Sequence, residues 1–339
     1  MAVYTEISFA DAAALLHRLN LGDLTDLRGI QGGIENTNYF VTSEQDGATI
    51  EHVLTVFERL GFDQLPYYLH LMKHLAGNGI PVPEPMADGL GEVMHRLQGK
   101  PAAVVAKLRG KSELAPTEQH CEAVGAMLAQ MHLAGRDFGM SQPNLRGLGW
   151  WNQTVPVVLP YLEDSQRQLI QTELAYQNHV AAMPAYAALP RGPVHADLFR
   201  DNVMFEDGAL TGFFDFYFAG NDTWLFDLAV CLNDWAIHHG APDIDGQHQP
   251  DLAQAMLAAY QSVRPLSAAE RGLLPAMLRA AALRFWLSRL WDWHLPRDAA
   301  MLKPHDPRHF ERVLRARVGA PSALIANLLE DPAKAAITA

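Results

Sequence analysis

Basic residues and cysteines are scarce in this sequence, and each shortage excludes a class of function. The 339 residues include 26 Lys and Arg against 38 Asp and Glu, a net charge of −12 at pH 7. Nucleic acids and anionic membrane surfaces are bound through clustered cations, so we expect neither partner. The two cysteines, Cys121 and Cys231, form no Cys-x-x-Cys or zinc-type spacing, which indicates reduced thiols in a reducing compartment.

Long hydrophobic runs are also absent. No stretch approaches the ~18 consecutive apolar residues of a membrane-spanning helix. The N-terminus has no basic segment followed by an unbroken apolar one, because Glu6 and Asp11 interrupt it. We therefore expect a cytoplasmic protein, whose oligomeric state the sequence does not determine. With 49% apolar and 19% charged residues, the chain can bury a large core, and its length favours two lobes around a cleft.

The first hundred residues predict a small antiparallel sheet with one main helix. A short helix is expected over 8–19, with Ser8 as its cap, and a longer one over 65–76, where leucines recur at helical spacing. Aliphatic and aromatic runs separated by Gly-rich turns predict the strands. These strands cover 27–31, 39–42, 52–57, 93–97 and 102–108.

After Lys107 the pattern becomes mainly helical. Helices are predicted over 118–134, 164–181, 252–263 and 268–293, and one strand-like island covers Pro193 to Phe218. We therefore predict an α+β, bilobal protein-kinase-like fold, with a sheet-containing N-lobe at 1–105 and a mostly helical C-lobe at 106–339.

The island carries the candidate chemistry. Its sequence contains His195-Ala-Asp197, then Asn202, and then Phe214-Asp215-Phe216 after the turn signal Glu206-Asp207-Gly208-Ala209. A hairpin here brings Asp215 beside Asn202. Asn202 and Asp215 offer the hard oxygen ligands that Mg²⁺ prefers, and Asp197 offers a carboxylate to accept a hydroxyl proton. Asp and Asn at this spacing also cap turns, but the whole string together favours phosphoryl transfer.

These motifs resemble those of the aminoglycoside phosphotransferase-like kinases. The helix that ends at His132 resembles the one before their catalytic loop, and Asp227 matches their structural anchor of the back lobe. Within that superfamily, bacterial homoserine kinases are similar over about residues 8–316. The similarity is carried by the segments 32–39, 53–58 and 283–289. The resemblance implies ATP and Mg²⁺ as cofactors and L-homoserine as the small-molecule acceptor.

The loop between the first two predicted strands is a candidate for binding ATP phosphates. Gly32 and Gly33 let the backbone approach an anion, and Asn36, Thr37 and Asn38 add polar donors. The same composition would also suit a plain hairpin loop.

By the resemblance, the adenine lies against the strand 102–108. Backbone groups of Ala106, Lys107 and Leu108 would contact the base edge, and Val53 would contact the ring.

One expected residue is missing from the third predicted strand. Related kinases carry a Lys there that pairs with ATP phosphates and with an acidic residue on the next helix. Here the position is Thr55, and the helix 65–76 contains no Asp or Glu. Since the cation and its counter-ion are missing together, a variant phosphate site is indicated, with no replacement cation evident. The absence also keeps open a non-catalytic nucleotide-binding protein.

The acceptor pocket is expected on the helix 268–293 and beside the catalytic loop. A carboxylate suits an Arg, so Arg284 is the first candidate and Arg200 the second. Ser288 and Asp292 follow Arg284 at four-residue intervals and lie on the same helix face. An aromatic core face would look the same. Choline, methylthioribose or an aminoglycoside therefore remain alternative acceptors, choline because Trp286, Trp291 and Trp293 could form an aromatic cage.

Overall fold

The computed structural model describes residues 5–30, 36–240, 243–295 and 304–319, which divide into two compact units. The first unit comprises Met1–Gly110 and Thr211–Phe216, and the second comprises Lys111–Leu210 and Tyr217–Ala339. The boundary predicted between residues 105 and 106 lies within strand β5, Lys100–Ala106, and the first compact unit extends to Gly110. The predicted α+β class is confirmed.

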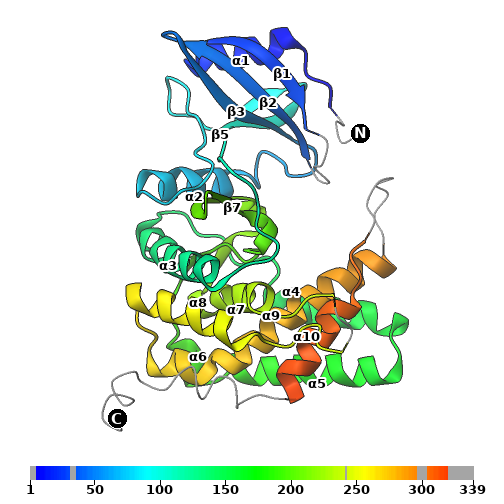
Figure 1. The fold of residues 1–339 in the computed structure, drawn as a ribbon. Helices are drawn as coiled ribbons and strands as arrows, with labels where there is room; N and C mark the ends of the chain where they lie inside the picture. The colour runs from blue at the N-terminus through cyan, green and yellow to red at the C-terminus, as the bar shows by residue number, and fades with distance from the viewer. Residues whose placement is uncertain (1–4, 31–35, 241–242, 296–303, 320–339) are drawn as a thin grey trace, which may run out of the picture. The chain divides into compact units, whose positions relative to one another are not determined.

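A five-stranded antiparallel sheet forms the framework of the first unit (Figure 1). Its order is β1-β2-β3-β5-β4. The left-handed Asp46 and Gly47 form the tight turn between the second and third strands, as the sequence pattern predicted. The strands are β1 Asp23–Gly29, β2 Asn36–Gln45, β3 Ala48–Phe57, β4 His95–Leu97 and β5 Lys100–Ala106.

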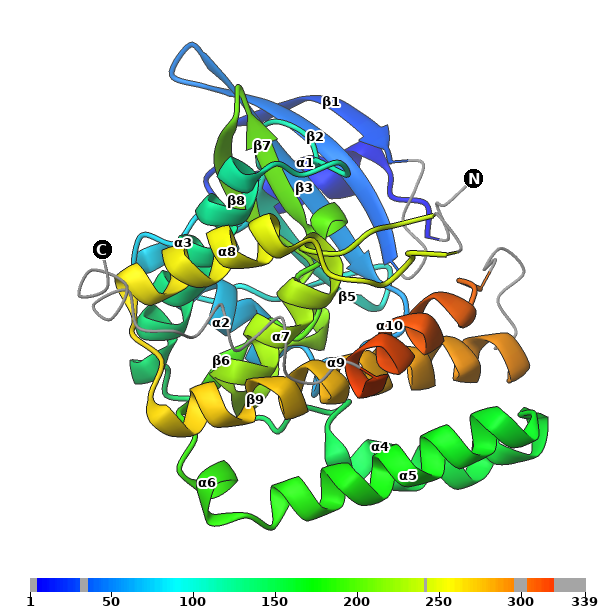
Figure 2. The same cartoon turned by 60° about the horizontal axis from the view of Figure 1, so that its bottom comes forward.

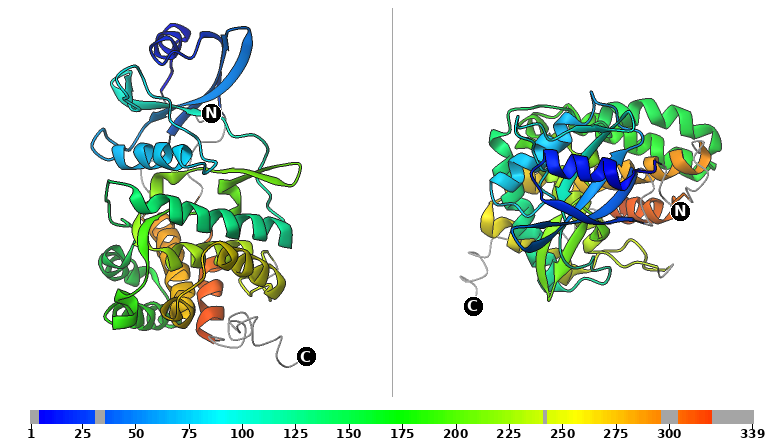
Figure 3. Two further views of the ribbon diagram at one scale, coloured as in Figure 1. Left: turned by 90° about the vertical axis from the view of Figure 1, so that its left-hand side faces the viewer. Right: turned by 90° about the horizontal axis from the view of Figure 1, so that it is seen from above.

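Helix α1, Phe9–Arg18, covers one face of this sheet (Figure 3). Ser8 caps it by accepting a hydrogen bond from the amide of Asp11, which confirms the predicted start. The buried side chains of α1 pack on alternate residues of the strands, including Tyr39, Val41 and Leu54. Residues of opposite parity, among them Asn38 and Thr55, therefore lie on the other face of the sheet. Helix α2, Pro66–Gly77, completes the unit.

The second unit is mainly helical (Figure 2). Helices α3 and α8 pack so closely that a Cβ added at Gly125 of α3 would overlap the carbonyl oxygen of Met256 in α8. Helix α9 is the longest and contacts α7, α10, α4 and α5. None of the described helices is long and apolar enough to cross a membrane. The helices are α3 Glu118–Ala134, α4 Leu148–Val158, α5 Asp164–Ala181, α6 Pro184–Ala187, α7 Trp224–Trp235, α8 Pro250–Val263, α9 Ala268–His294 and α10 Arg308–Gly319.

Two short strand pairs frame the predicted chemical island. Strand β6, Arg191–Val194, pairs with β9, Gly220–Thr223, and β7, Val203–Glu206, pairs with β8, Ala209–Phe213. The segment from 195 to 202 joins β6 to β7 and contains the single 3₁₀ turn Arg200–Asn202. The predicted hairpin thus forms, and its preceding loop carries Asp197.

Candidate functional site

A buried carboxylate holds the backbone of the loop that carries Asp197. Asp227 lies in the first turn of α7, and its side chain is fully buried. Its Oδ2 accepts a hydrogen bond from the amide of His195, and its Oδ1 accepts one from the amide of Ala196, both at 2.8 Å. The two amides immediately before Asp197 are therefore held by one side chain, in the anchoring role that the resemblance implied for Asp227.

The backbone beside Asp197 is in an uncommon conformation. Ala196 has φ = +63°, and Asp215 in the predicted metal motif has φ = +65°. A left-handed conformation costs a residue with a Cβ roughly 1–2 kcal/mol, so it persists only where surrounding contacts impose it. The Asp227 carboxylate is such a contact for Ala196. Strained non-glycine residues in both motifs are typical of a functional site.

A buried polar chain extends from Asp227 to the start of α9. His132 Nε2 lies 3.1 Å from Asp227 Oδ2, and its Nδ1 lies 2.8 Å from the hydroxyl oxygen of Tyr260. That hydroxyl accepts a hydrogen bond from Nε of Arg264 at 3.0 Å, so it donates to His132. Arg264 is in turn paired with Glu270 of α9. The sequence did not predict this series of hydrogen bonds. The only local sign of it was a histidine at the end of a helix face that is otherwise apolar.

The pKa values along this chain follow from burial and hydrogen bonding. Burial lowers the pKa of His132, against the opposing effect of Asp227, so the imidazole is neutral and donates from Nε2. Burial alone would raise the pKa of Asp227. The hydrogen bonds from His132 and from the His195 amide outweigh it and keep that pKa below its ordinary value. The anchor is therefore an ionised carboxylate with three donors.

Asn202 is held directly against Asp197. Its Nδ2 donates to the backbone oxygen of Asp197 at 2.7 Å and lies 3.5 Å from the carboxylate oxygen Oδ2. These contacts orient the side-chain amide so that its nitrogen faces the loop, which leaves its oxygen for another partner. The structure thus brings together the predicted base and one predicted metal ligand.

Asp215 belongs to the first unit, whereas Asn202 belongs to the second. Asp215 follows β8, and β8 pairs with β7, the strand that begins directly after Asn202. The convergence of the two side chains on one metal stays a prediction.

Arg284 of α9 reaches the predicted base. Its Nη1 lies 3.8 Å from Asp197 Oδ1, and its guanidinium stacks on the rings of Phe285 and Phe218. The side chain is almost fully buried, and its Nε and Nη2 have no hydrogen-bond partner. Burial lowers its pKa to about 10, although Asp197 favours the charged form.

The remaining acceptor candidates differ in their surroundings. Arg200 is held by the protein, because its guanidinium pairs with Asp234 and donates to the backbone oxygen of Leu114. Ser288 and Asp292 are half-buried on α9, and the charge of Asp292 acts on Arg284. The roles of all four candidates in acceptor binding stay predictions.

The candidate nucleotide residues of the first unit divide between the two faces of the sheet. Asn38 and Thr55 are register partners, and the Thr55 hydroxyl donates to Asn38 Oδ1 at 2.8 Å, so they share the face opposite α1. Asn36 and Val53 share their parity and therefore that face. Thr37 lies on the α1 face, where its hydroxyl donates to Glu58 at 2.6 Å.

Related kinases have a Lys at the position of Thr55, and the neighbouring ion pair does not supply a cation on the sheet face where Thr55 lies. Lys100 pairs with Glu58, but both share the parity of the residues that face α1. The pair therefore lies on the face away from Thr55.

Three further nucleotide candidates follow the last strand. The amide of Ala106 already donates to the backbone oxygen of Glu84 at 2.9 Å, and Lys107 pairs with Glu51. Leu108 lies against Gly212, where it would meet an added Cβ. Gly32 and Gly33 lie outside the described residues.

Comparison with known proteins identifies the family. The model of the phosphotransferase enzyme family matches residues 26–271. A homoserine kinase of Polaromonas naphthalenivorans is 66% identical, over 96% of this chain and 100% of the relative. A homoserine kinase of Cupriavidus necator is 56% identical, over 95% of this chain and 98% of the relative.

Solved structures confirm the predicted kinase-like fold. An amicoumacin kinase in complex with AMP-PNP and Ca²⁺ matches with a TM-score of 0.64 and 15% identity, covering 89% of this chain and 88% of that one. Together with the anchored Asp197 loop, these matches assign the chain. It belongs to the phosphotransferase enzyme family and, within it, to the homoserine kinases.

Proposed function

We propose that this protein transfers the γ-phosphoryl group of ATP to the side-chain hydroxyl of L-homoserine, which gives O-phospho-L-homoserine in threonine biosynthesis. The observation that carries the proposal is the 66% identity to a homoserine kinase over nearly the whole of both chains. The kinase-like fold and the anchored Asp197 loop support the same chemistry. The cytoplasmic location expected from the sequence is part of the proposal.

Asp197 acts as the base in this reaction. Its carboxylate accepts the hydroxyl proton of the acceptor and aligns the oxygen for in-line attack on the γ-phosphorus. The cation of Arg284 at 3.8 Å favours the ionised carboxylate, which is the form that can accept a proton. The Asp227 anchor fixes the backbone on which this carboxylate stands.

The residues for magnesium fit the ion by their donor chemistry. Asn202 uses its amide nitrogen on the loop and leaves a carbonyl oxygen, and Asp215 contributes carboxylate oxygens. Hard oxygen donors of this kind, few in number, are what Mg²⁺ takes from protein when phosphate oxygens supply the rest. When bound, the ion neutralises charge on the transferring phosphate. Asp215→Ala should abolish Mg²⁺-dependent turnover and Asn202→Ala should weaken it, which titration of rate against Mg²⁺ measures.

Choline is less well supported as an acceptor. Trp286, one of the three tryptophans that suggested an aromatic cage, is fully buried and has no ring face open to a ligand. Trp293 by contrast is 48% exposed, so the three do not line a common site.

An ATP-consumption assay across homoserine, choline, methylthioribose and kanamycin tests the proposed function. We expect turnover with homoserine to exceed the other three by a wide margin in kcat/KM. Equal or better turnover with another acceptor contradicts the assignment, and no turnover with any of the four contradicts a kinase role for this chain.

A further inference from the structure

A cavity of about 230 Å³ lies within the second unit, beside the catalytic loop. Three consecutive loop residues after Asp197 line it, together with residues of α7, α9 and α10. Pockets for drug-sized ligands begin at ~300 Å³, so this one suits a smaller molecule such as an amino acid. Its lining residues are Leu114, Phe199, Arg200, Asp201, Asp234, His239, Arg289 and His309.

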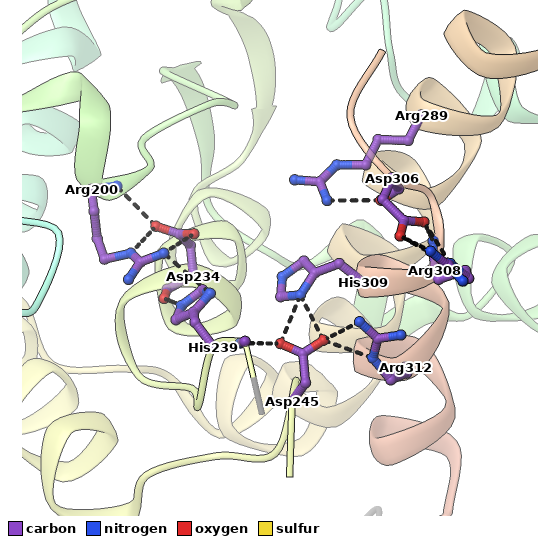
Figure 4. A network of polar contacts seen from close by, with 10 residues as sticks. Arg200, Asp234, His239, Asp245, Arg289, Asp306, Arg308, His309 and Arg312 are labelled. Carbon is purple, nitrogen blue, oxygen red and sulfur yellow. Dashed lines mark hydrogen bonds and ion pairs between the residues drawn. The ribbon is translucent and has the colours of Figure 1, made fainter. Parts of the chain in front are cut away.

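One wall of the cavity is already satisfied within the protein. Arg200 pairs with Asp234 at 3.1 Å, and Asp234 also accepts a hydrogen bond from the Arg200 amide at 2.8 Å. His239 lies 3.1 Å from Arg200 and donates from Nε2 to the Asp234 backbone oxygen (Figure 4). These groups form a neutral, hydrogen-bonded surface that needs no ligand.

Two lining residues of opposite charge remain without a counter-ion. Among the described residues, neither Arg289 nor Asp201 forms an ion pair. The guanidinium of Arg289 donates once, to the Asp306 backbone oxygen at 3.2 Å, and otherwise stacks on Phe310. Figure 4 shows it pointing toward the space beside His309.

The electrostatics of both groups indicate missing partners. Burial lowers the pKa of Arg289, so its charged form is poorly compensated. Desolvation and the neighbouring Asp234 raise the pKa of Asp201 against the opposing charge of Arg200, although the residue is exposed. A ligand with an anionic and a cationic group would compensate both, whereas a simple anion would meet Asp201 and Asp234.

A metal ion fits the same region poorly. His239, Asp245 and His309 place three potential ligand atoms within 4.8 Å of one another. However, Asp245 already accepts hydrogen bonds from Arg312, from His309 and from the Gly240 amide. A divalent cation would displace Arg312 or stand beside it, which Coulomb repulsion opposes.

The cavity is also placed for the reaction. Arg289 stands five residues after Arg284 on α9, and Arg284 contacts the Asp197 carboxylate. The charge of Arg289 itself acts on Asp197 and on Asp201. A small acceptor could therefore present its hydroxyl to Asp197 while its other end enters the cavity.

We infer that this cavity binds the amino-acid end of the acceptor, with Arg289 receiving the α-carboxylate and Asp201 the α-ammonium. The inference rests on the proposed function. It assigns the acceptor carboxylate to Arg289, whose guanidinium lines the cavity, and not to Arg284, whose unpartnered nitrogens are buried. Arg284 is then a positioning residue for Asp197.

The test compares three alcohols in Arg289→Met, Asp201→Asn and a control. The alcohols are homoserine, aminopropanol, which lacks the carboxylate, and γ-hydroxybutyrate, which lacks the ammonium. Arg308→Met is the matched control, because Arg308 lies nearby on α10 but is exposed, pairs with Asp306 and does not line the cavity.

In Arg289→Met we expect KM for homoserine to rise ~10²-fold, as for a lost charge-assisted pair, with no change for aminopropanol. In Asp201→Asn we expect it to rise ~10-fold, with no change for γ-hydroxybutyrate. The KM for ATP should be unchanged in both, and Arg308→Met should match the wild type.

Calorimetric titration of homoserine without nucleotide separates the two claims. Wild type that binds homoserine but does not phosphorylate it contradicts the proposed function and leaves the cavity assignment supported if Arg289→Met abolishes binding. Wild-type affinity for homoserine in both variants overturns the assignment of the cavity. If Arg289→Met does not fold, Arg289→Lys takes its place in the test, since a Lys keeps the charge but loses the bidentate geometry. Asp201→Asn, at an exposed site, then tests the ammonium contact independently.

Discussion

Replacing Asp227 by Asn should damage both stability and turnover, and the structure allows the size of each effect to be worked out. Asp227 Oδ2 accepts two hydrogen bonds, from His195 and His132, and Oδ1 accepts one from Ala196. An Asn would place its oxygen where two donors converge, so its NH₂ group would face the Ala196 amide. One charge-assisted bond is lost and two become neutral. At ~1.5–3 kcal/mol for a charged and ~0.5–1.5 for a neutral hydrogen bond, the loss is about 3.5–6 kcal/mol.

The effect on turnover arises from the backbone. Without its hydrogen bond to Asp227, Ala196 loses the contact that holds its φ at +63°. Its backbone then relaxes and moves the adjacent Asp197. A displacement of about 1 Å at a catalytic group can cost ~10²-fold, so we expect kcat to fall by roughly 10- to 100-fold.

A matched control separates this effect from general destabilisation. Glu173 of α5 is also a buried carboxylate, bonded to Gln177 at 2.8 Å and paired with Arg279 of α9. It makes no contact with the catalytic loop, and Glu173→Gln should destabilise by a similar amount, since a buried ion pair loses one charge. Thermal unfolding and steady-state kinetics are measured on both variants at a temperature where both are folded. Wild-type kcat in Asp227→Asn, or an equal loss of kcat in Glu173→Gln, would refute the reasoning.

Three further outcomes are expected. Asp197→Asn should lower kcat by at least ~10²-fold, the scale of general-base loss, with unchanged thermal midpoint and ATP binding, and near-normal turnover in a steady-state assay would remove Asp197 from this role. Gly125→Ala should destabilise the fold by ~1–3 kcal/mol, because its Cβ would overlap the backbone of Met256, whereas Gly272→Ala on an exposed helix surface should stabilise it by ~0.5–1 kcal/mol. Denaturant titration measures both variants, and stabilisation by both substitutions would disprove the close approach of Gly125 to Met256. Burial and the charge of Arg317 lower the pKa of His248 from 6.5 to about 3, so the unfolded chain binds the extra proton and stability is lost as pH falls below 6.5. At pH 5 this loss is ~2 kcal/mol, and His248→Gln should remove it from the pH dependence of unfolding; an unchanged pH slope in the variant contradicts the assignment.

The helices predicted from the sequence are ones whose apolar residues recur at helical spacing, but not every such helix was predicted. The bounds predicted for α3 and α5 are the observed ones. Helix α7 was not predicted as a helix; every residue from Trp224 to Trp235 is buried, so this helix has no solvent-exposed polar face. Helix α4 was also missed, and it contains Pro156, which argues against a helix interior. Helix α10 was missed although Phe310, Val313 and Leu314 recur at helical spacing.

The candidate site divides in the same way between local and distant contacts. Asp197 and Asn202 are five residues apart, so a sequence motif could place them on one loop, and their hydrogen bond shows that they meet. The link from Asp227 through His132 to Tyr260 joins three helices, and no spacing in the sequence reports it. Such contacts depend on helix packing rather than on local propensity.

Helix α9 connects these separate features. Its first turn holds Glu270, the end of the polar chain from the Asp227 anchor, and its middle carries Arg284 against Asp197. Five residues later, Arg289 lines the cavity. The catalytic loop and the cavity thus both contact one helix, which contains no proline between Arg284 and Arg289.

That spacing bears on the size of the acceptor. Five helical residues correspond to a rise of ~7.5 Å along the axis of α9, from Arg284 to Arg289. An extended four-carbon amino acid spans a length of this order from hydroxyl to carboxylate, whereas a multi-ring aminoglycoside is several times longer. Arg284 contacts the base at one end of this stretch, and the Arg200–Asp234 pair lines the cavity at the other, so the proposed binding mode takes a short acceptor with charged groups at the end opposite its hydroxyl.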